Sequence, residues 1–303
     1  MPALRAPWVP MQGIRQAAMF SMLLFACTAA TNGREEVRSV SGTVSSPQGV
    51  PIAYETVGSG EPAVVLVHGW SCDRSYWRAQ VEPLSRDFQV VTLDLHGHGE
   101  SGKGSDLWTI ASFGDDVAAV VKDLELEEVV LVGHSMGGDV VVEAARRIPS
   151  RVAGLVWVDT YQQLPISRTA AEVQKLVAPF RTDFAGTTDS VIRGKFPEGA
   201  DRELVQRVAS DMAAAPADVA VASLVSSFTH AAEIPADLEE LQLPVIAINP
   251  EEPPTDTDSM ASYGVEVLLV PGVGHFLMME APEVFNRVLR EAISNFPRDG
   301  SSS

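Results

Sequence analysis

The stretch that most constrains this chain is residues 129–138, Val-Val-Leu-Val-Gly-His-Ser-Met-Gly-Gly. A run of β-branched and aliphatic residues that ends at glycine indicates a strand buried on both faces, as in a parallel sheet. Residues 139–147 follow with helical spacing, so a Gly-x-Ser-x-Gly pattern lies between a strand and a helix. Glycine is expected at 133 and 137 because a side chain there would crowd the facing strand and helix. The pattern predicts a sharp turn that presents the Ser135 hydroxyl at the sheet edge, beside the N–H groups of the helix start.

Three further motifs follow the order seen in one known family. They are Val-Val-Leu-Val-His-Gly-Trp at 64–70, Asp-Leu-His-Gly-His-Gly-Glu-Ser at 94–101 and Gly-Val-Gly-His-Phe at 272–276. With the serine turn, they make the chain resemble the α/β-hydrolase superfamily over roughly residues 50–297. The resemblance implies an α/β fold with a mostly parallel, doubly wound sheet of about eight strands. It also implies a helical cap inserted after the sixth strand.

The hydropathy pattern supports one large domain with an insertion. Alternating residues at 37–45 and 50–57, separated by turn residues, predict an antiparallel hairpin. About eighty-five residues separate Asp159 from the next clear strand, and a connection of that length is rarely a bare loop. Amphipathic helices are predicted within it, and the resemblance identifies them as the cap. We therefore expect a hydrolase domain at 37–297, with its cap at about 160–243 and a disordered tail at 298–303.

The N-terminal residues have the features of an export signal. Arg5 and Arg15 precede the apolar stretch 17–26, which is too short to span a bilayer and is followed by small residues. Residues 1–30 are therefore predicted to be a bacterial signal peptide, followed by a polar tether at 31–36. The mature protein is expected to be periplasmic, extracellular or membrane-anchored.

The mode of processing is left open by the sequence. Leu-Phe-Ala-Cys at 24–27 resembles a lipoprotein cleavage box with Cys27 as the lipidated residue, although Phe25 is bulky for its place in that box. Simple cleavage near residue 29 or 30 and an uncleaved anchor are the alternatives. Membrane contact is expected only through such an N-terminal anchor. The other cysteine, Cys72, is interpreted as a packed thiol.

Composition excludes some classes of function. The formal net charge of −18 disfavours binding to nucleic acid or to an anionic membrane. His96 and His98 lie two residues apart, but no further ligands with metal-site spacing accompany them, so no metal is predicted. The glycine-rich loops lack the strand–GxGxxG–helix context of a dinucleotide site, so no cofactor is predicted. The expected partner is a small ester-like molecule, and the oligomeric state is not indicated.

A serine hydroxyl needs a neighbouring base, and that base needs an orienting acid. His275 is the candidate base, because the Gly-Val-Gly-His loop follows the last strand and returns to the edge where Ser135 lies. The resemblance places the oxyanion donors at the backbone N–H groups of Trp70 and Met136.

Two carboxylates are candidates for the acid. Most members of the family carry Gly-x-x-Asp after the strand at 245–248, but here that pattern is broken and Glu251 is the candidate in that loop. Asp159 ends the preceding strand, where certain haloalkane dehalogenases of the superfamily keep their acid. The sequence favours Asp159, with Glu251 as the alternative.

The residue type at the turn indicates the reaction. Haloalkane dehalogenases and epoxide hydrolases of the superfamily use an aspartate there, so Ser135 favours acyl transfer instead. We expect a carboxylic ester hydrolase that acts through an acyl-enzyme and a Ser-His-Asp/Glu triad. A lactonase, an aminopeptidase, a C–C hydrolase and a perhydrolase are alternatives within the same scaffold. A non-catalytic protein that binds a ligand under the cap is the alternative from another class.

Overall fold

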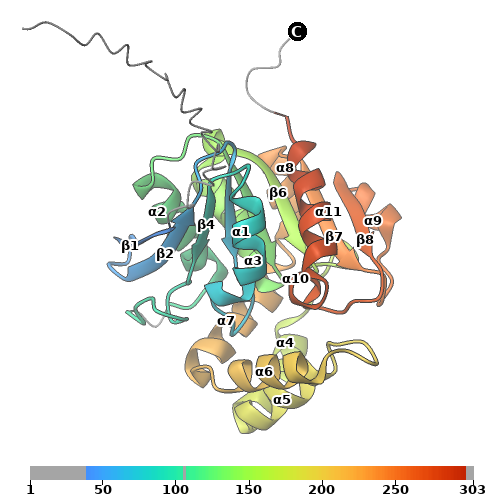
Figure 1. The fold of residues 1–303 in the computed structure, drawn as a ribbon. Helices are drawn as coiled ribbons and strands as arrows, with labels where there is room; N and C mark the ends of the chain where they lie inside the picture. The colour runs from blue at the N-terminus through green and yellow to red at the C-terminus, as the bar shows by residue number, and fades with distance from the viewer. Residues whose placement is uncertain (1–38, 105–106, 298–303) are drawn as a thin grey trace, which may run out of the picture. The chain divides into compact units, whose positions relative to one another are not determined.

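A computed structural model of the chain describes residues 39–104 and 107–297 (Figure 1). The expected signal peptide at 1–30, the tether at 31–36 and the tail at 298–303 lie outside the described residues. Cys27 and the cleavage alternatives lie outside them too, so these expectations remain predictions.

An eight-stranded sheet forms the centre of the described part, in the order β1-β2-β4-β3-β5-β6-β7-β8. β1 pairs antiparallel with β2, and β2 with β4, whereas the remaining neighbours are parallel. The expected mostly parallel sheet is therefore confirmed. The strands are β1 (Ser39–Ser45), β2 (Pro51–Val57), β3 (Ala63–Val67), β4 (Val90–Leu93), β5 (Val129–His134), β6 (Val152–Val158), β7 (Val245–Pro250) and β8 (Val265–Val270).

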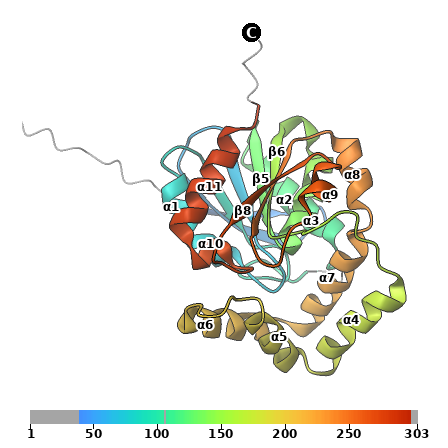
Figure 2. The same ribbon diagram turned by 90° about the vertical axis from the view of Figure 1, so that its right-hand side faces the viewer.

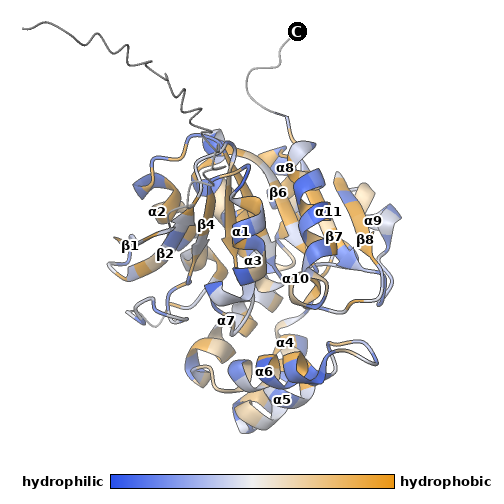
Figure 3. Cartoon of the chain, in the orientation of Figure 1, coloured by the Kyte–Doolittle hydropathy of each residue, from blue (hydrophilic) through white to orange (hydrophobic). Residues whose placement is uncertain are grey.

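The central strands are apolar because both of their faces are covered. Every residue of β3, β4, β5 and β7 is buried, and these strands are mainly hydrophobic in Figure 3. Parallel strands covered by helices on both faces have this uniform composition. The carboxyl ends of β5 and β6 therefore open side by side at one edge of the sheet, since the two strands pair in register up to His134 and Val158.

Helices cover both faces of the sheet and form the cap. They are η1 (Arg74–Trp77), α1 (Arg78–Leu84), α2 (Ile110–Asp123), α3 (Met136–Arg147), η2 (Pro149–Arg151), α4 (Ala170–Thr182), α5 (Phe184–Arg193), α6 (Arg202–Ala213), α7 (Ala217–His230), α8 (Ile234–Leu241), α9 (Thr257–Ala261), α10 (Leu277–Glu280) and α11 (Pro282–Ser294). In Figure 2, α1 and α11 lie on one side of the sheet, and α2, α3 and α8 lie on the other.

The cap consists of α4 to α7, between β6 and β7, beyond the carboxyl ends of the strands (Figures 1 and 2). Its insertion after the sixth strand agrees with the fold that the resemblance implied. The sequence predicted helices at 169–177, 201–212 and 217–228, but it did not predict α5. That helix contains a glycine and two threonines, which have low helix propensity. The Asp183 carboxylate caps α5 by accepting from the Gly186 N–H, and α5 packs on α6.

Candidate active site

The turn between β5 and α3 holds Ser135 in a strained conformation. Its φ of 52° and ψ of −120° lie outside the regions that residues with side chains favour. The Ser135 N–H donates to the Val158 carbonyl at 2.9 Å, which fixes the turn against the end of β6. The hydroxyl therefore stands at the sheet edge, at the start of α3, as the sequence pattern predicted.

Close backbone contacts explain the glycines of this turn. A Cβ at Gly133 would lie 2.1 Å from the Gly137 carbonyl oxygen, and one at Gly137 would lie 2.7 Å from the Val67 and His68 carbonyl oxygens. Both contacts involve backbone atoms, which cannot rotate away. The expectation that side chains at these positions would crowd the facing elements agrees with this geometry.

We expect Gly133→Ala to lower the free energy of unfolding by about 3 kcal/mol, because it forces overpacking against backbone. Thermal unfolding followed by calorimetry measures the effect. Gly194→Ala is the matched control, because the nearest atom to its added Cβ is the Val191 oxygen at 3.4 Å and no positive φ is required. Equal melting temperatures for the two variants would contradict the packing argument.

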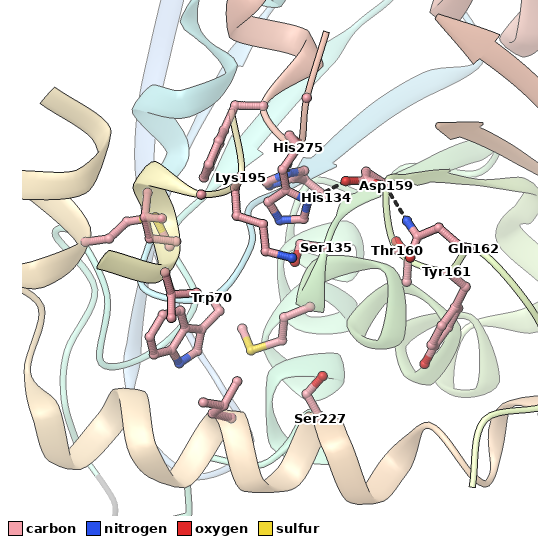
Figure 4. Close-up of a pocket in the computed structure, with 18 of the residues that line it drawn as sticks. Trp70, His134, Ser135, Asp159, Thr160, Tyr161, Gln162, Lys195, Ser227 and His275 are labelled. Atoms are coloured by element: carbon pink, nitrogen blue, oxygen red, sulfur yellow. Dashed lines mark hydrogen bonds and ion pairs between the residues drawn. The ribbon is translucent and has the colours of Figure 1, made fainter. Parts of the chain in front are cut away.

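His275 and Asp159 are joined directly. The His275 Nδ1 lies 2.5 Å from the Asp159 Oδ2, and the Gln162 amide donates to the Asp159 Oδ1 at 2.5 Å (Figure 4). Burial raises the pKa of Asp159, but the hydrogen bond and charge of His275 outweigh it. With smaller contributions from His134 and Lys195, the net pKa of Asp159 is lowered. Asp159 is therefore ionised at neutral pH and both of its oxygens accept hydrogen bonds.

The loop that carries His275 is held by groups that the sequence did not single out. The Glu280 carboxylate accepts from the backbone N–H groups of Gly274 and Phe276, each at 3.1 Å. The His275 N–H donates to the Lys195 carbonyl of the cap at 3.0 Å. The His134 Nε2 lies 2.9 Å from the His275 carbonyl oxygen. Burial lowers the pKa of His134 to about 3, so this ring is neutral and donates through Nε2.

Ser135 and His275 line the same cavity, which has a volume of about 1020 Å³. The structure records no hydrogen bond between the Ser135 hydroxyl and the His275 ring. Such a contact is often long in an empty site and shortens when substrate binds. The cavity lies between core and cap, and its lining includes Met212, Leu224 and Phe228 of the cap helices.

Two backbone N–H groups stand beside the serine. Met136 is the first residue of α3, so its N–H has no acceptor within the helix. The Trp70 N–H has no acceptor among the described residues. The Trp70 indole donates to the Ala220 carbonyl of α7 at 2.7 Å and packs edge-on against Phe180, which links this loop to the cap.

The remaining candidates lie elsewhere. Glu251 is exposed, does not line the cavity and is not joined to His275. Cys72 is buried at the cavity wall, and burial raises the pKa of its thiol well above the ordinary value. His96 is buried against Asp116, with Nδ1 2.6 Å from Oδ2, and His98 is buried beside it.

One described cluster has side chains of metal-ligating type. Donor atoms of Glu143, His230 and Asp237 lie within 4.8 Å of one another. However, the Glu143 oxygens accept from Arg146 at 2.8 Å and Arg147 at 2.5 Å, and Arg146 also pairs with Asp237 at 3.3 Å. Because guanidinium groups already neutralise these carboxylates, the cluster fits an ion-pair network between α3, α7 and α8 better than a metal centre.

None of the described helices is by itself long and apolar enough to cross a membrane. α6 and α7 meet that test only as a pair bent by 97°, on length and composition alone.

Similarity to known proteins agrees with the fold and bears on the site. The chain matches the family model of the alpha/beta hydrolase fold over residues 62–209. It is 32% identical over 131 residues to a dihydrolipoyllysine-residue acetyltransferase component of the acetoin cleaving system from Cupriavidus necator, a match that covers 43% of this chain. The chain spans only 31% to 35% of the length of the first four curated relatives that it matches.

Two proteins of similar length match more completely. The pimeloyl-[acyl-carrier protein] methyl ester esterase of Edwardsiella ictaluri is 27% identical, over 78% of this chain and 95% of the relative. The structure of a thermophilic esterase from Thermogutta terrifontis superposes with a TM-score of 0.71 and 26% identity, over 84% of this chain and 98% of the esterase. The sheet order, the cap and these matches agree, and the chain belongs to the α/β-hydrolase superfamily, with esterases among its homologues.

Proposed function

We propose that the protein is a serine hydrolase of carboxylic esters, with Ser135 as nucleophile, His275 as general base and Asp159 as the orienting acid. The observation that carries the proposal is the 2.5 Å bond between His275 and Asp159 in a cavity that also contains the strained Ser135 turn. A hydroxyl, an imidazole and a buried carboxylate in this arrangement are the groups that acyl transfer requires. The esterases among the homologues support the same class of reaction.

The proposed reaction has two halves. The Ser135 oxygen attacks the ester carbonyl while His275 accepts the hydroxyl proton, and the N–H groups of Trp70 and Met136 stabilise the oxyanion. The alkoxide then leaves with the proton from His275, and an acyl-enzyme remains on Ser135. Water attacks this acyl-enzyme with His275 again as the base, and the carboxylic acid is released. Asp159 holds the His275 ring in the required tautomer and stabilises the imidazolium in both halves.

The cavity bears on the size and polarity of the substrate. Its volume of about 1020 Å³ lies near the upper end of the range for small-molecule sites. Its cap side is lined mainly by apolar and aromatic side chains, such as Leu176, Phe180, Ile192 and Phe228. We therefore infer that the acyl or alcohol part of the substrate is bound largely by apolar contact beneath the cap.

Two assays on the purified protein test the proposal. Hydrolysis of 4-nitrophenyl esters from acetate to decanoate measures ester turnover, and a fluorophosphonate probe with mass spectrometry identifies the reactive serine. We expect turnover of this series and one labelled site at Ser135. Lactones, proline amides and peracid formation, assayed in parallel, separate the esterase from the alternative reactions. Labelling at another residue, or ligand binding without turnover of any substrate class, would contradict the proposal.

A further inference from the structure

Lys195 brings a positive charge to the proposed reaction centre. It lies in the connection between α5 and α6 and lines the cavity, and Figure 4 shows its side chain extending toward Ser135. Burial and the contacts of His275 dominate the pKa of Asp159, and the Lys195 charge adds to the lowering. The ammonium is therefore close enough to act electrostatically on the pair formed by His275 and Asp159.

The backbone at Lys195 is fixed against the His275 loop. Its carbonyl accepts from the His275 N–H at 3.0 Å. A Cβ at Gly274 would lie 2.3 Å from that carbonyl oxygen, so the two segments approach as closely as backbones can. The neighbouring Phe196 stacks on Phe276, with ring centroids 5.1 Å apart. These contacts hold the base of the lysine side chain at a constant place relative to His275.

The carboxylates of the cavity do not neutralise this lysine. Both oxygens of Asp159 accept from Gln162 and His275. Both oxygens of Asp139 accept as well, from the hydroxyls of Tyr161 and Ser227. Glu252 is exposed at the cavity lining. Among the described residues, the Lys195 ammonium has no hydrogen-bond acceptor or ion-pair partner, and it projects into a mainly apolar space.

A second cation of the cavity is already engaged. The Arg168 guanidinium lies over the Phe228 ring, 5.1 Å from its centroid, and its charge acts on Asp139. Lys195 is thus the cation that remains available beside Ser135. The formal net charge of −18 repels anions from the chain as a whole, so an anionic substrate needs a local cation of this kind.

We propose that Lys195 binds a carboxylate on the substrate close to the scissile ester, and that the preferred substrates are anionic esters. This inference rests on the proposed esterase function and names its substrate class. The carboxylate is carried either on the acyl side, as in a monoester of a dicarboxylic acid, or on the alcohol side, as in an acylated hydroxy acid. An ammonium–carboxylate bond in a partly enclosed site favours the charged ester over its neutral isostere by about tenfold.

Two pairs of isosteric esters test the proposal and distinguish the two sources of the carboxylate. Ethyl hydrogen succinate is compared with ethyl 4-methylpentanoate, and O-butanoylglycolate with isobutyl butanoate, by acid release in a pH-stat. The quantity measured is the ratio of kcat/KM for the anionic ester to that for the neutral ester. We expect Lys195→Met to lower this ratio about tenfold in one pair, and Lys195→Arg to retain most of it. Lys175→Met, which removes an exposed lysine of the same cap outside the cavity, is the matched control.

The outcomes separate charge recognition from other roles. An unchanged ratio in Lys195→Met would overturn the proposal. A parallel fall for the neutral and anionic esters would overturn it too, since the lysine would then act on the reaction itself. Binding of N-ethylsuccinamate, a non-hydrolysable analogue, is measured by calorimetry against N-ethyl-4-methylpentanamide. If no ester is turned over but Lys195→Met weakens binding of the charged analogue alone about tenfold, the esterase function fails while the anion site stands. Equal affinity of wild type and Lys195→Met for that analogue would remove the anion site.

Discussion

Replacement of Ser135 by alanine is expected to lower kcat for ester hydrolysis by roughly 10⁴-fold or more and to abolish fluorophosphonate labelling. The acyl-enzyme is formed on the Ser135 oxygen, so the variant has no group that can accept the acyl chain. The remaining N–H donors at Trp70 and Met136 leave only residual rate enhancement. Steady-state kinetics with a 4-nitrophenyl ester and gel fluorescence of the probe measure the two effects.

The fold should survive this change, because serine and alanine both carry a Cβ at the same positive φ. Its free energy of unfolding is expected to stay within about 0.5 kcal/mol of the parent. Ser227→Ala is the matched control: it removes a hydroxyl from the same cavity, one that donates to Asp139 at 2.6 Å. We expect this control to remain labelled and to lose less than about tenfold in kcat. A Ser135→Ala variant that turns over like the parent would show that the nucleophile lies elsewhere.

The serine turn could be predicted from sequence because its determinants are local. A buried strand, two glycines and a helix start lie within ten consecutive residues, and each is required by contacts inside that stretch. The order of the strands followed from the same kind of reading, since uniformly apolar segments indicate parallel strands covered on both faces. The structure adds the distances: the Cβ contacts at Gly133 and the bond from the Ser135 N–H to Val158.

The groups that surround the site could not be predicted, because their contacts join residues distant in sequence. Lys195 meets the His275 loop across eighty intervening positions, and its role depends on how the cap lies over the sheet. Gln162 and Glu280 are common polar residues in loops or helix ends, and nothing in their neighbours indicates a partner. The helix α5 was missed because its stability comes from packing on α6 and from the Asp183 cap rather than from propensity.

The choice of acid was left open for a related reason. Both Asp159 and Glu251 follow parallel strands at the same sheet edge, so strand order alone does not separate them. The local conformation differs, however. Asp159 has a φ of 46° at the end of β6, is buried and faces His275, whereas the Glu251 side chain is exposed beyond β7. This geometry supports the assignment of Asp159, which kinetics can test.

Replacement of Asp159 by asparagine is expected to lower kcat by roughly 10³- to 10⁴-fold, or about 4 to 5.5 kcal/mol of transition-state stabilisation. The carboxylate fixes the His275 tautomer and stabilises the imidazolium that forms as Ser135 attacks, and an amide does neither well. KM should change far less, because the Asp159 oxygens are taken by His275 and Gln162 and do not need to touch substrate. Steady-state kinetics at neutral pH measure both parameters.

Glu251→Gln removes the competing carboxylate and provides the matched control, with an expected loss in kcat of less than about tenfold. Both variants should first be compared with the parent by circular dichroism and thermal melting, since Asp159 also binds Gln162 and a local collapse would mimic a catalytic loss. A large loss in Glu251→Gln beside an active Asp159→Asn would reverse the assignment. Large losses in both would mean that the loop after β7 moves toward His275 during turnover and that the two carboxylates act together. Because Glu251 is exposed and separate from His275 in the structure, we expect the loss to be confined to Asp159→Asn.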